Sequence, residues 1–165
     1  MGQITIGLAV IEVGAAAPTG TMPTTLTKIG KTYRDTCKIT QDAAEVTEHF
    51  EEGKAAPEYR KKTRKIPKLT FSLMDADPQM LADYVGGEVV SGKWVYDGNE
   101  IVENKSIRVK SEQGLDFEIP NADIEAVINS DMSAKGIFLV DFTVTPLAVE
   151  TGKALRAAPK STPTP

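Results

Sequence analysis

Histidine and cysteine each occur once in this 165-residue chain, as His49 and Cys37. A structural zinc site draws its four ligands mainly from these two residue types, so the composition excludes one. A single cysteine also excludes an intrachain disulfide, and we expect folding in a reducing compartment. A catalytic Ser-His or Cys-His pair would have to use His49, which stands beside acidic residues in a segment without hydrophobic pattern. We therefore interpret His49 as an exposed histidine and Cys37 as a small buried apolar residue.

Long apolar runs are missing as well. No stretch approaches the roughly 20 apolar residues that span a bilayer. The N-terminal GLAVIEVGAAAP lacks a basic flank and is interrupted by Glu12, so we expect no cleaved signal peptide. Asp75 and Asp77 are explained by a helix start, and Gly86-Gly87 lacks the spacing of a phosphate-binding loop. We predict a protein that is not an enzyme, needs no cofactor or metal, and has no membrane partner.

Period-two alternation of apolar and polar residues dominates what is present and predicts β-strands with one buried face. Alternating apolar residues are Tyr33, Cys37 and Ile39; Leu69, Phe71 and Leu73; Trp94 and Tyr96; Ile107 and Val109; Leu115, Phe117 and Ile119; Ile124, Ala126 and Ile128; and Phe138, Val140, Phe142 and Val144. Glu112-Gln113-Gly114 and SDMSAKG supply hairpin turns. The pattern predicts a mainly β fold of two packed antiparallel sheets.

One segment, DADPQMLADYVGG, favours a short helix over about 77–85. Asp77 is placed as N-cap, Pro78 at the first helical position and Gly86 after the last turn. Met80, Leu81, Tyr84 and Val85 then fall on one side, where they can cover an end of the sheet. We predict one domain over 1–150, with 1–24 as a flexible arm, and a flexible proline-rich tail over 151–165.

A charged segment without hydrophobic period, HFEEGKAAPEYRKKTRK, occupies residues 49–65 between two predicted strands. Six basic against three acidic residues give it +3, so the rest of a chain of net charge −4 carries −7. Such asymmetry favours partners, including other copies of the chain. Loops beyond about 12–15 residues in a compact domain are usually functional or disordered. We predict a long loop here that contacts another protein.

Two other interpretations of this segment stay open. In the first, Tyr59 stacks on bases and the basic residues neutralise nucleic-acid phosphates. Against it, the sequence pI of about 5.1 is low for a dedicated nucleic-acid binder. In the second, 49–65 is simply a solvated loop.

Two parts of the chain resemble a known family. ITQDAAEVTEHFEEG, the charged loop and KIPKLTFSLMDADPQMLADYVGG are similar to the major tail tube proteins of long-tailed bacteriophages. FEIPNADIEAVINSDMSAKGIFLVDFTVTPL is similar to the same family's closing strands. The resemblance is in particular to the variants carried by phages and prophages of gut Bacteroidales. The resemblance covers roughly residues 25–148 and rests on the order of features.

The resemblance implies a structural subunit that closes into hexameric rings, which stack into a hollow tube conducting DNA. It implies the fold shared with tubes of contractile tails and type VI secretion, a place in the virion tail, and assembly in the cytoplasm of the bacterial host. Tape-measure and tail terminator proteins are the other implied partners, and double-stranded DNA passes without specific binding. A tube of a contractile injection or type VI-like secretion system is the alternative.

In this family, a long loop between two early strands reaches the neighbouring ring, and 49–65 holds that position. The implied contact residues are Phe50, Glu51, Glu52, Tyr59, Arg60, Lys61, Lys62 and Arg64. An acidic lumen wall would repel DNA phosphates. The candidates for that wall are Asp116, Glu118, Glu125 and Asp141.

Overall fold

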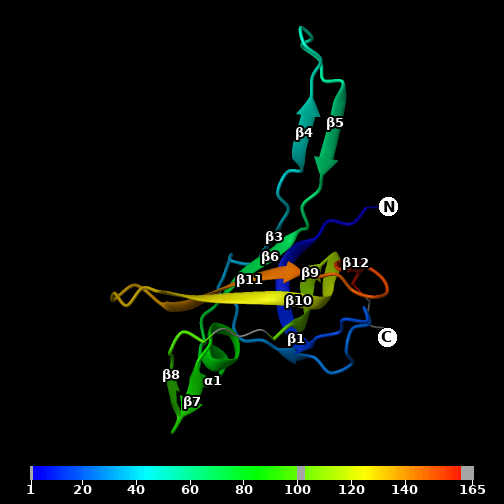
Figure 1. The fold of residues 1–165 in the computed structure, drawn as a ribbon. Helices are drawn as coiled ribbons and strands as arrows, with labels where there is room; N and C mark the ends of the chain where they lie inside the picture. Colours follow the sequence, from blue (N-terminus) through cyan, green and yellow to red (C-terminus); the bar gives the residue numbers. More distant parts are fainter. Residues whose placement is uncertain (1, 100–102, 161–165) are drawn as a thin grey trace, which may run out of the picture.

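An eight-stranded antiparallel sheet forms the body of the protein (Figure 1). The computed structural model describes residues 2–99 and 103–160. The strands of this sheet are β1 (Ile6–Ala15), β2 (Thr27–Lys28), β3 (Lys38–Thr40), β6 (Lys68–Leu73), β9 (Lys105–Gln113), β10 (Leu115–Ser130), β11 (Phe138–Pro146) and β12 (Arg156–Pro159). Their order is β2-β1-β9-β10-β11-β6-β3, and β12 pairs with β10. The predicted mainly β, antiparallel fold is confirmed.

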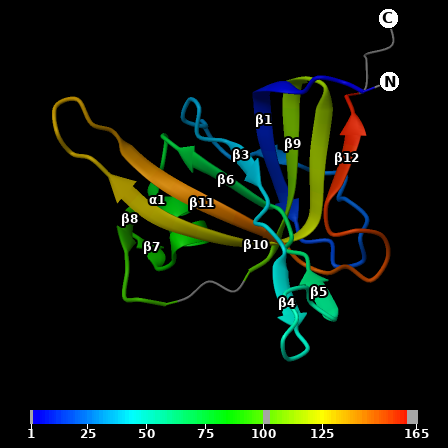
Figure 2. The same cartoon turned by 90° about the horizontal axis from the view of Figure 1, so that it is seen from above.

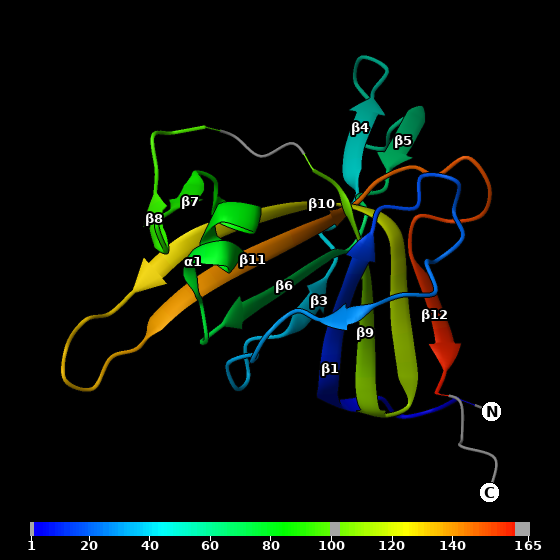
Figure 3. The ribbon, with the colours of Figure 1, turned by 90° about the horizontal axis from the view of Figure 1, so that it is seen from below.

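The long strand β10 bends the sheet into two packed halves. Its first part pairs with β9 and β12 and its second part with β11, and the register shifts between Ile119 and Ala122. Pro120 lies at this shift, where a residue without an amide hydrogen interrupts the ladder. The first half-sheet therefore comprises β2, β1, β9, residues 115–119 and β12. The second comprises residues 122–130, β11, β6 and β3 (Figure 3).

Both half-sheets supply the core that lies between them. The buried apolar residues are Ile11, Val13, Leu69, Phe71, Leu73, Ile107, Val109, Ile119, Ala122, Ala126, Val140, Phe142 and Val144. Phe71 and Phe142 stack with ring centroids 5.0 Å apart. The alternation that predicted β6, β9, β10 and β11 therefore identified inward-facing residues, and the arrangement is that of a sandwich made from one bent sheet.

The predicted helix is present as α1 (Pro78–Met80), which continues into a π-helical turn, η1 (Leu81–Val85). The Asp77 carboxylate accepts a hydrogen bond from the Met80 amide at 2.8 Å, as expected of an N-cap. Gly86 ends the helix with φ 123°, a conformation that glycine adopts without strain. Tyr84 packs edge-on against Phe142 with centroids 5.3 Å apart, so the helix covers the core as predicted.

Two small hairpins stand apart from the main sheet. One joins β4 (Glu45–His49) to β5 (Tyr59–Thr63), and the other joins β7 (Glu88–Val90) to β8 (Lys93–Val95). Beside the second, Trp94 stacks on Tyr96 and donates a hydrogen bond from Nε1 to the Gly86 carbonyl at 2.7 Å. Figure 2 shows β4–β5 projecting away from the body.

Four sequence predictions of local structure need correction. The expected flexible arm 1–24 contains β1, whose Ile11 is 1% exposed in the core. A bulge between Leu8 and Val10 shifts the alternation, and this hid the strand. The expected flexible tail 151–165 contains β12, while residues 161–165 lie outside the described part.

The strand expected from Tyr33 onward begins only at Lys38, because Asp35 takes a left-handed φ of 61° that interrupts extended backbone. The predicted long loop 49–65 also differs from the structure. Six of its seventeen residues are strand, because His49 ends β4 and the five residues of β5 pair back onto β4.

Candidate assembly interface

The segment between β3 and β6 forms a protruding arm, here defined as residues 41–67. Thr40 and Lys68 are directly paired, so the arm is an insertion into a β3–β6 hairpin connection. Within it β4 and β5 run antiparallel, with Val46 opposite Lys62 and His49 opposite Tyr59. All ten strand residues of β4 and β5 are exposed. The arm is held by its own cross-strand pairs and contributes no residue to the core.

Ion pairs neutralise much of the arm's charge. Arg60 Nε lies 2.8 Å from a Glu48 carboxylate oxygen, and Lys65 Nζ lies 3.4 Å from Glu45. Lys54 pairs with Glu51 and with Glu58, and these two carboxylates raise the pKa of its ammonium group. Counted over residues 41–67, six basic and six acidic residues give a net charge of zero.

The sequence interpretation of a basic arm is therefore corrected to a polarised one. Its strand β4 and the residue Asp42 are acidic, and they lie beside the basic strand β5 and residues 64–65. The tip, residues 50–58, has three glutamates and one lysine and so carries −2. The remainder of the arm carries +2. The predicted segment began at residue 49, so it left out most of the acidic strand β4, which pairs with the basic strand β5.

The predicted contact residues fall into two groups on this arm. Phe50, Glu51 and Glu52 are at the tip, where Phe50 is 54% exposed. Tyr59, Arg60, Lys61 and Lys62 are on β5 and Arg64 follows it. Among the described residues, Lys61, Lys62 and Arg64 form no ion pair.

Tyr59 lies beside His49, with ring centroids 6.1 Å apart. Its side chain is 58% exposed on the arm surface. A large aromatic side chain that stays exposed on a projecting hairpin is available for contact with another molecule.

The four predicted lumen acids do not share one surface. Asp116 and Glu118 belong to the first half-sheet, and Glu125 and Asp141 to the second. Because the core lies between the half-sheets, their outer faces point away from each other. If one face of the subunit lines a channel, that face therefore carries either Asp116 and Glu118 or Glu125 and Asp141, but not all four.

Three of the four acids are also engaged within the subunit. Asp116 accepts a hydrogen bond from the Ser111 amide at 2.8 Å. Glu118 pairs with Arg108 at 2.9 Å and with Arg156 at 3.4 Å. Asp141 accepts from the Ser72 hydroxyl and, at 2.9 Å, from the Asn129 amide. Glu125 is the exposed member of the set.

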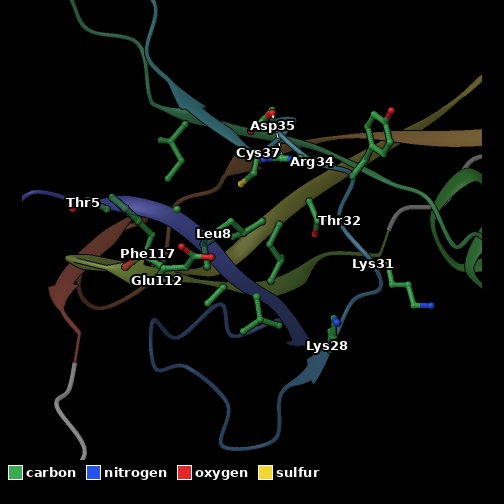
Figure 4. A pocket seen from close by; sticks show the side chains of 18 of the residues that line it. Thr5, Leu8, Lys28, Lys31, Thr32, Arg34, Asp35, Cys37, Glu112 and Phe117 are labelled. Carbon is green, nitrogen blue, oxygen red and sulfur yellow. Dashed lines mark ion pairs between the residues drawn. The ribbon is translucent and has the colours of Figure 1, made fainter. Parts of the chain in front are cut away.

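A groove that the sequence did not reveal lies between β1 and the segment 28–39 (Figure 4). Its volume is about 720 Å³, and Leu8, Cys37, Ile39 and Phe117 are among the apolar residues that line it. Burial raises the pKa of the Cys37 thiol to about 11, so the thiol is protonated at neutral pH. The sequence signal that could have predicted the β1 wall of this groove is the alternation of the apolar residues Ile4, Ile6 and Leu8.

No known family model matches the chain, and a search of curated proteins found no relative. Within the described residues, no group of three or more His, Cys, Asp or Glu side chains is placed to hold a metal ion. No helix in that part of the chain is long and apolar enough to cross a membrane.

Proposed function

We propose that this protein is a structural subunit of a bacteriophage tail tube, which assembles with copies of itself into stacked rings around a DNA conduit. The observation that carries this proposal is the arm. A two-stranded hairpin with no buried face is marginally stable in water, and its two open edges invite pairing with another chain. A contact with a neighbouring subunit would bury part of the hairpin surface and fix the direction in which the arm points.

The body suits the same role. The core of the sandwich contains no residue of the arm, so the residues that maintain the fold differ from those that would make the contact. The resemblance over roughly residues 25–148 supports the proposal, because it implies that the arm corresponds to the inter-ring loop of tail tube proteins. Rings related by a repeated head-to-tail contact grow into a tube without a fixed end, as heterologous interfaces do.

The test is electron microscopy of the purified protein at high concentration, where rings or tubes are expected. A variant with Lys61→Glu, Lys62→Glu and Arg64→Glu should stop tube growth while its circular dichroism stays unchanged. Exposed surface charges contribute little to folding, whereas like charges across an interface oppose association. The matched control reverses Lys93, Lys135 and Lys153, which lie outside the arm.

Wild-type protein that stays monomeric at all accessible concentrations would contradict the proposed function. Normal tubes from the charge-reversed arm would remove these three side chains from the contact. A salt-dependent shift of DNA by the monomer, lost in the arm variant, would instead favour the nucleic-acid interpretation.

A further inference from the structure

The groove between β1 and segment 28–39 has an apolar floor that the fold leaves open. Residues of both half-sheets meet there, including Leu8 and Phe117 of the first and Ile39 of the second. Among the residues that line it, Tyr33 and Ile39 are each 37% exposed. An apolar surface of this kind on a polar protein marks a contact site.

One wall of the groove is an unpaired strand edge. On the side away from β9, β2 pairs with β1 only at Glu12 and Val13. Among the described residues, the part of β1 from Ile6 to Val10 has no strand on that side. Free backbone donors and acceptors along such an edge can bind an extended segment of another chain.

The opposite wall of the groove is basic, so its charge is opposite in sign to that of the arm tip. Lys28, Lys31 and Arg34 of this wall line the groove (Figure 4). Four basic residues and one acidic residue give the segment 28–38 a charge of +3, against −2 for the tip 50–58. Opposite charges on two surfaces of one molecule favour a head-to-tail contact between copies.

The arm cannot place its tip in its own groove. It leaves the body at the β3–β6 end and points away from it (Figures 1 and 2). A five-residue strand alone spans about 17 Å at 3.3–3.4 Å per residue, and the tip lies beyond it. The acidic tip therefore lies well outside the reach of the segment 28–38 in the same chain.

We propose that the groove of one subunit receives the arm tip of a second copy. Phe50 enters the apolar floor, and Glu52 and its neighbouring glutamates face Lys31 and Arg34. This inference rests on the proposed self-assembly and names the surface that receives the arm.

Cross-linking tests the contact directly, because Cys37 is the only cysteine and lines the groove. In the variant Ala55→Cys each chain carries one thiol in the groove and one on the tip. Oxidation of assembled protein at mildly alkaline pH, which compensates for the raised pKa of Cys37, should give a ladder of covalent multimers. Mass spectrometry should find peptides joined between positions 37 and 55.

Two controls separate this ladder from chance collisions. Cys37→Ser in the Ala55→Cys background should leave dimers at most. Met132→Cys, at a position 84% exposed on the far β10–β11 loop, should give no link to Cys37. Assembly without any 37–55 peptide would overturn the groove as receptor and leave the proposed function standing, whereas wild-type protein that never assembles would overturn both.

A charge exchange gives an independent result. Lys31→Glu with Arg34→Glu should raise the concentration needed for assembly about tenfold or more, and so should Glu51→Lys with Glu52→Lys. The four changes together should restore assembly, because the opposite charges then meet again in reversed order. A combined variant no better than either pair would contradict the contact. Lys135→Glu serves as the neutral control.

Discussion

Phe71 and Phe142 show what single residues contribute to this fold. They lie on neighbouring strands in register, with ring planes 5° apart, and are 2% and 1% exposed. Tyr84 from η1 closes the cluster at an angle of 72° to Phe142. Burial of aromatic surface and the offset ring contacts both stabilise such a cluster. The helix is thereby fixed to the centre of the sheet.

We predict that Phe71→Ala or Phe142→Ala lowers the free energy of unfolding by roughly 3–5 kcal/mol. The loss combines the transfer term of the ring with the cavity that the stacked partner cannot fill. Chemical denaturation of the monomer measures it, and Phe50→Ala at the exposed tip is the matched control, expected within about 0.5 kcal/mol of the wild type. A loss below about 1 kcal/mol at both core positions would place these rings outside the core.

At the scale of elements, β1 and the arm differ in how much side-chain surface they bury. β1 belongs to the first half-sheet and buries Ile11 and Val13, whereas β4 and β5 bury nothing. Their stabilities therefore have different sources. β1 depends on tertiary packing, and the arm on cross-strand pairs such as Arg60 with Glu48.

We predict that replacement of residues 41–67 by Asn-Gly leaves a folded monomer. Thr40 and Lys68 are already paired, so a two-residue turn can join β3 directly to β6. Deletion of residues 1–15 is the counterpart and should abolish cooperative unfolding, because it removes the strand that places Ile11 and Val13 in the core. Thermal melts by circular dichroism compare the two, and an arm deletion that unfolds the body would show that the arm supports the core.

The difference between these elements also explains what the sequence revealed. Alternation is visible only where one face of a strand is buried, and it correctly predicted β6, β9, β10 and β11. The capping residues Asp77, Pro78 and Gly86 predicted the helix, because capping depends on neighbouring residues in the sequence and not on distant strands. β5 has no buried face, so nothing in its pattern separated it from a loop.

The candidate site was predictable in part for the same reason. Length and charge marked 49–65 as a contact segment, but the charge balance depends on which strands pair, and pairing is not local. The groove is a property of two strand edges far apart in sequence. Only the bend at Pro120 brings the half-sheets into position to form it.

At the scale of the whole molecule, the long strands of the two half-sheets arrange their outward-facing charges differently. On the first half-sheet, Arg108, Lys110 and Arg156 pair with Glu12 and Glu118 in one network. That network has three basic and two acidic members. On the second half-sheet, the strands β10 and β11 present Asp123, Glu125 and Asp141 instead. In the proposed tube an acidic wall would repel DNA phosphates, so we propose the face of β10 and β11 on the second half-sheet as the lumen wall.

This assignment predicts the effect of Asp123→Lys with Glu125→Lys, two exposed positions whose reversal leaves the core untouched. Assembled wild-type tubes should leave short duplex DNA in the supernatant on sedimentation. Tubes of the variant should carry DNA into the pellet, because a basic wall binds phosphates and releases their counterions. Raised salt should release that DNA, since phosphate contacts weaken steeply with ionic strength. Glu150→Lys is the control for added positive charge elsewhere on the subunit. Variant tubes that pellet no more DNA than this control would move the lumen wall to another face, with the arm and its groove unaffected.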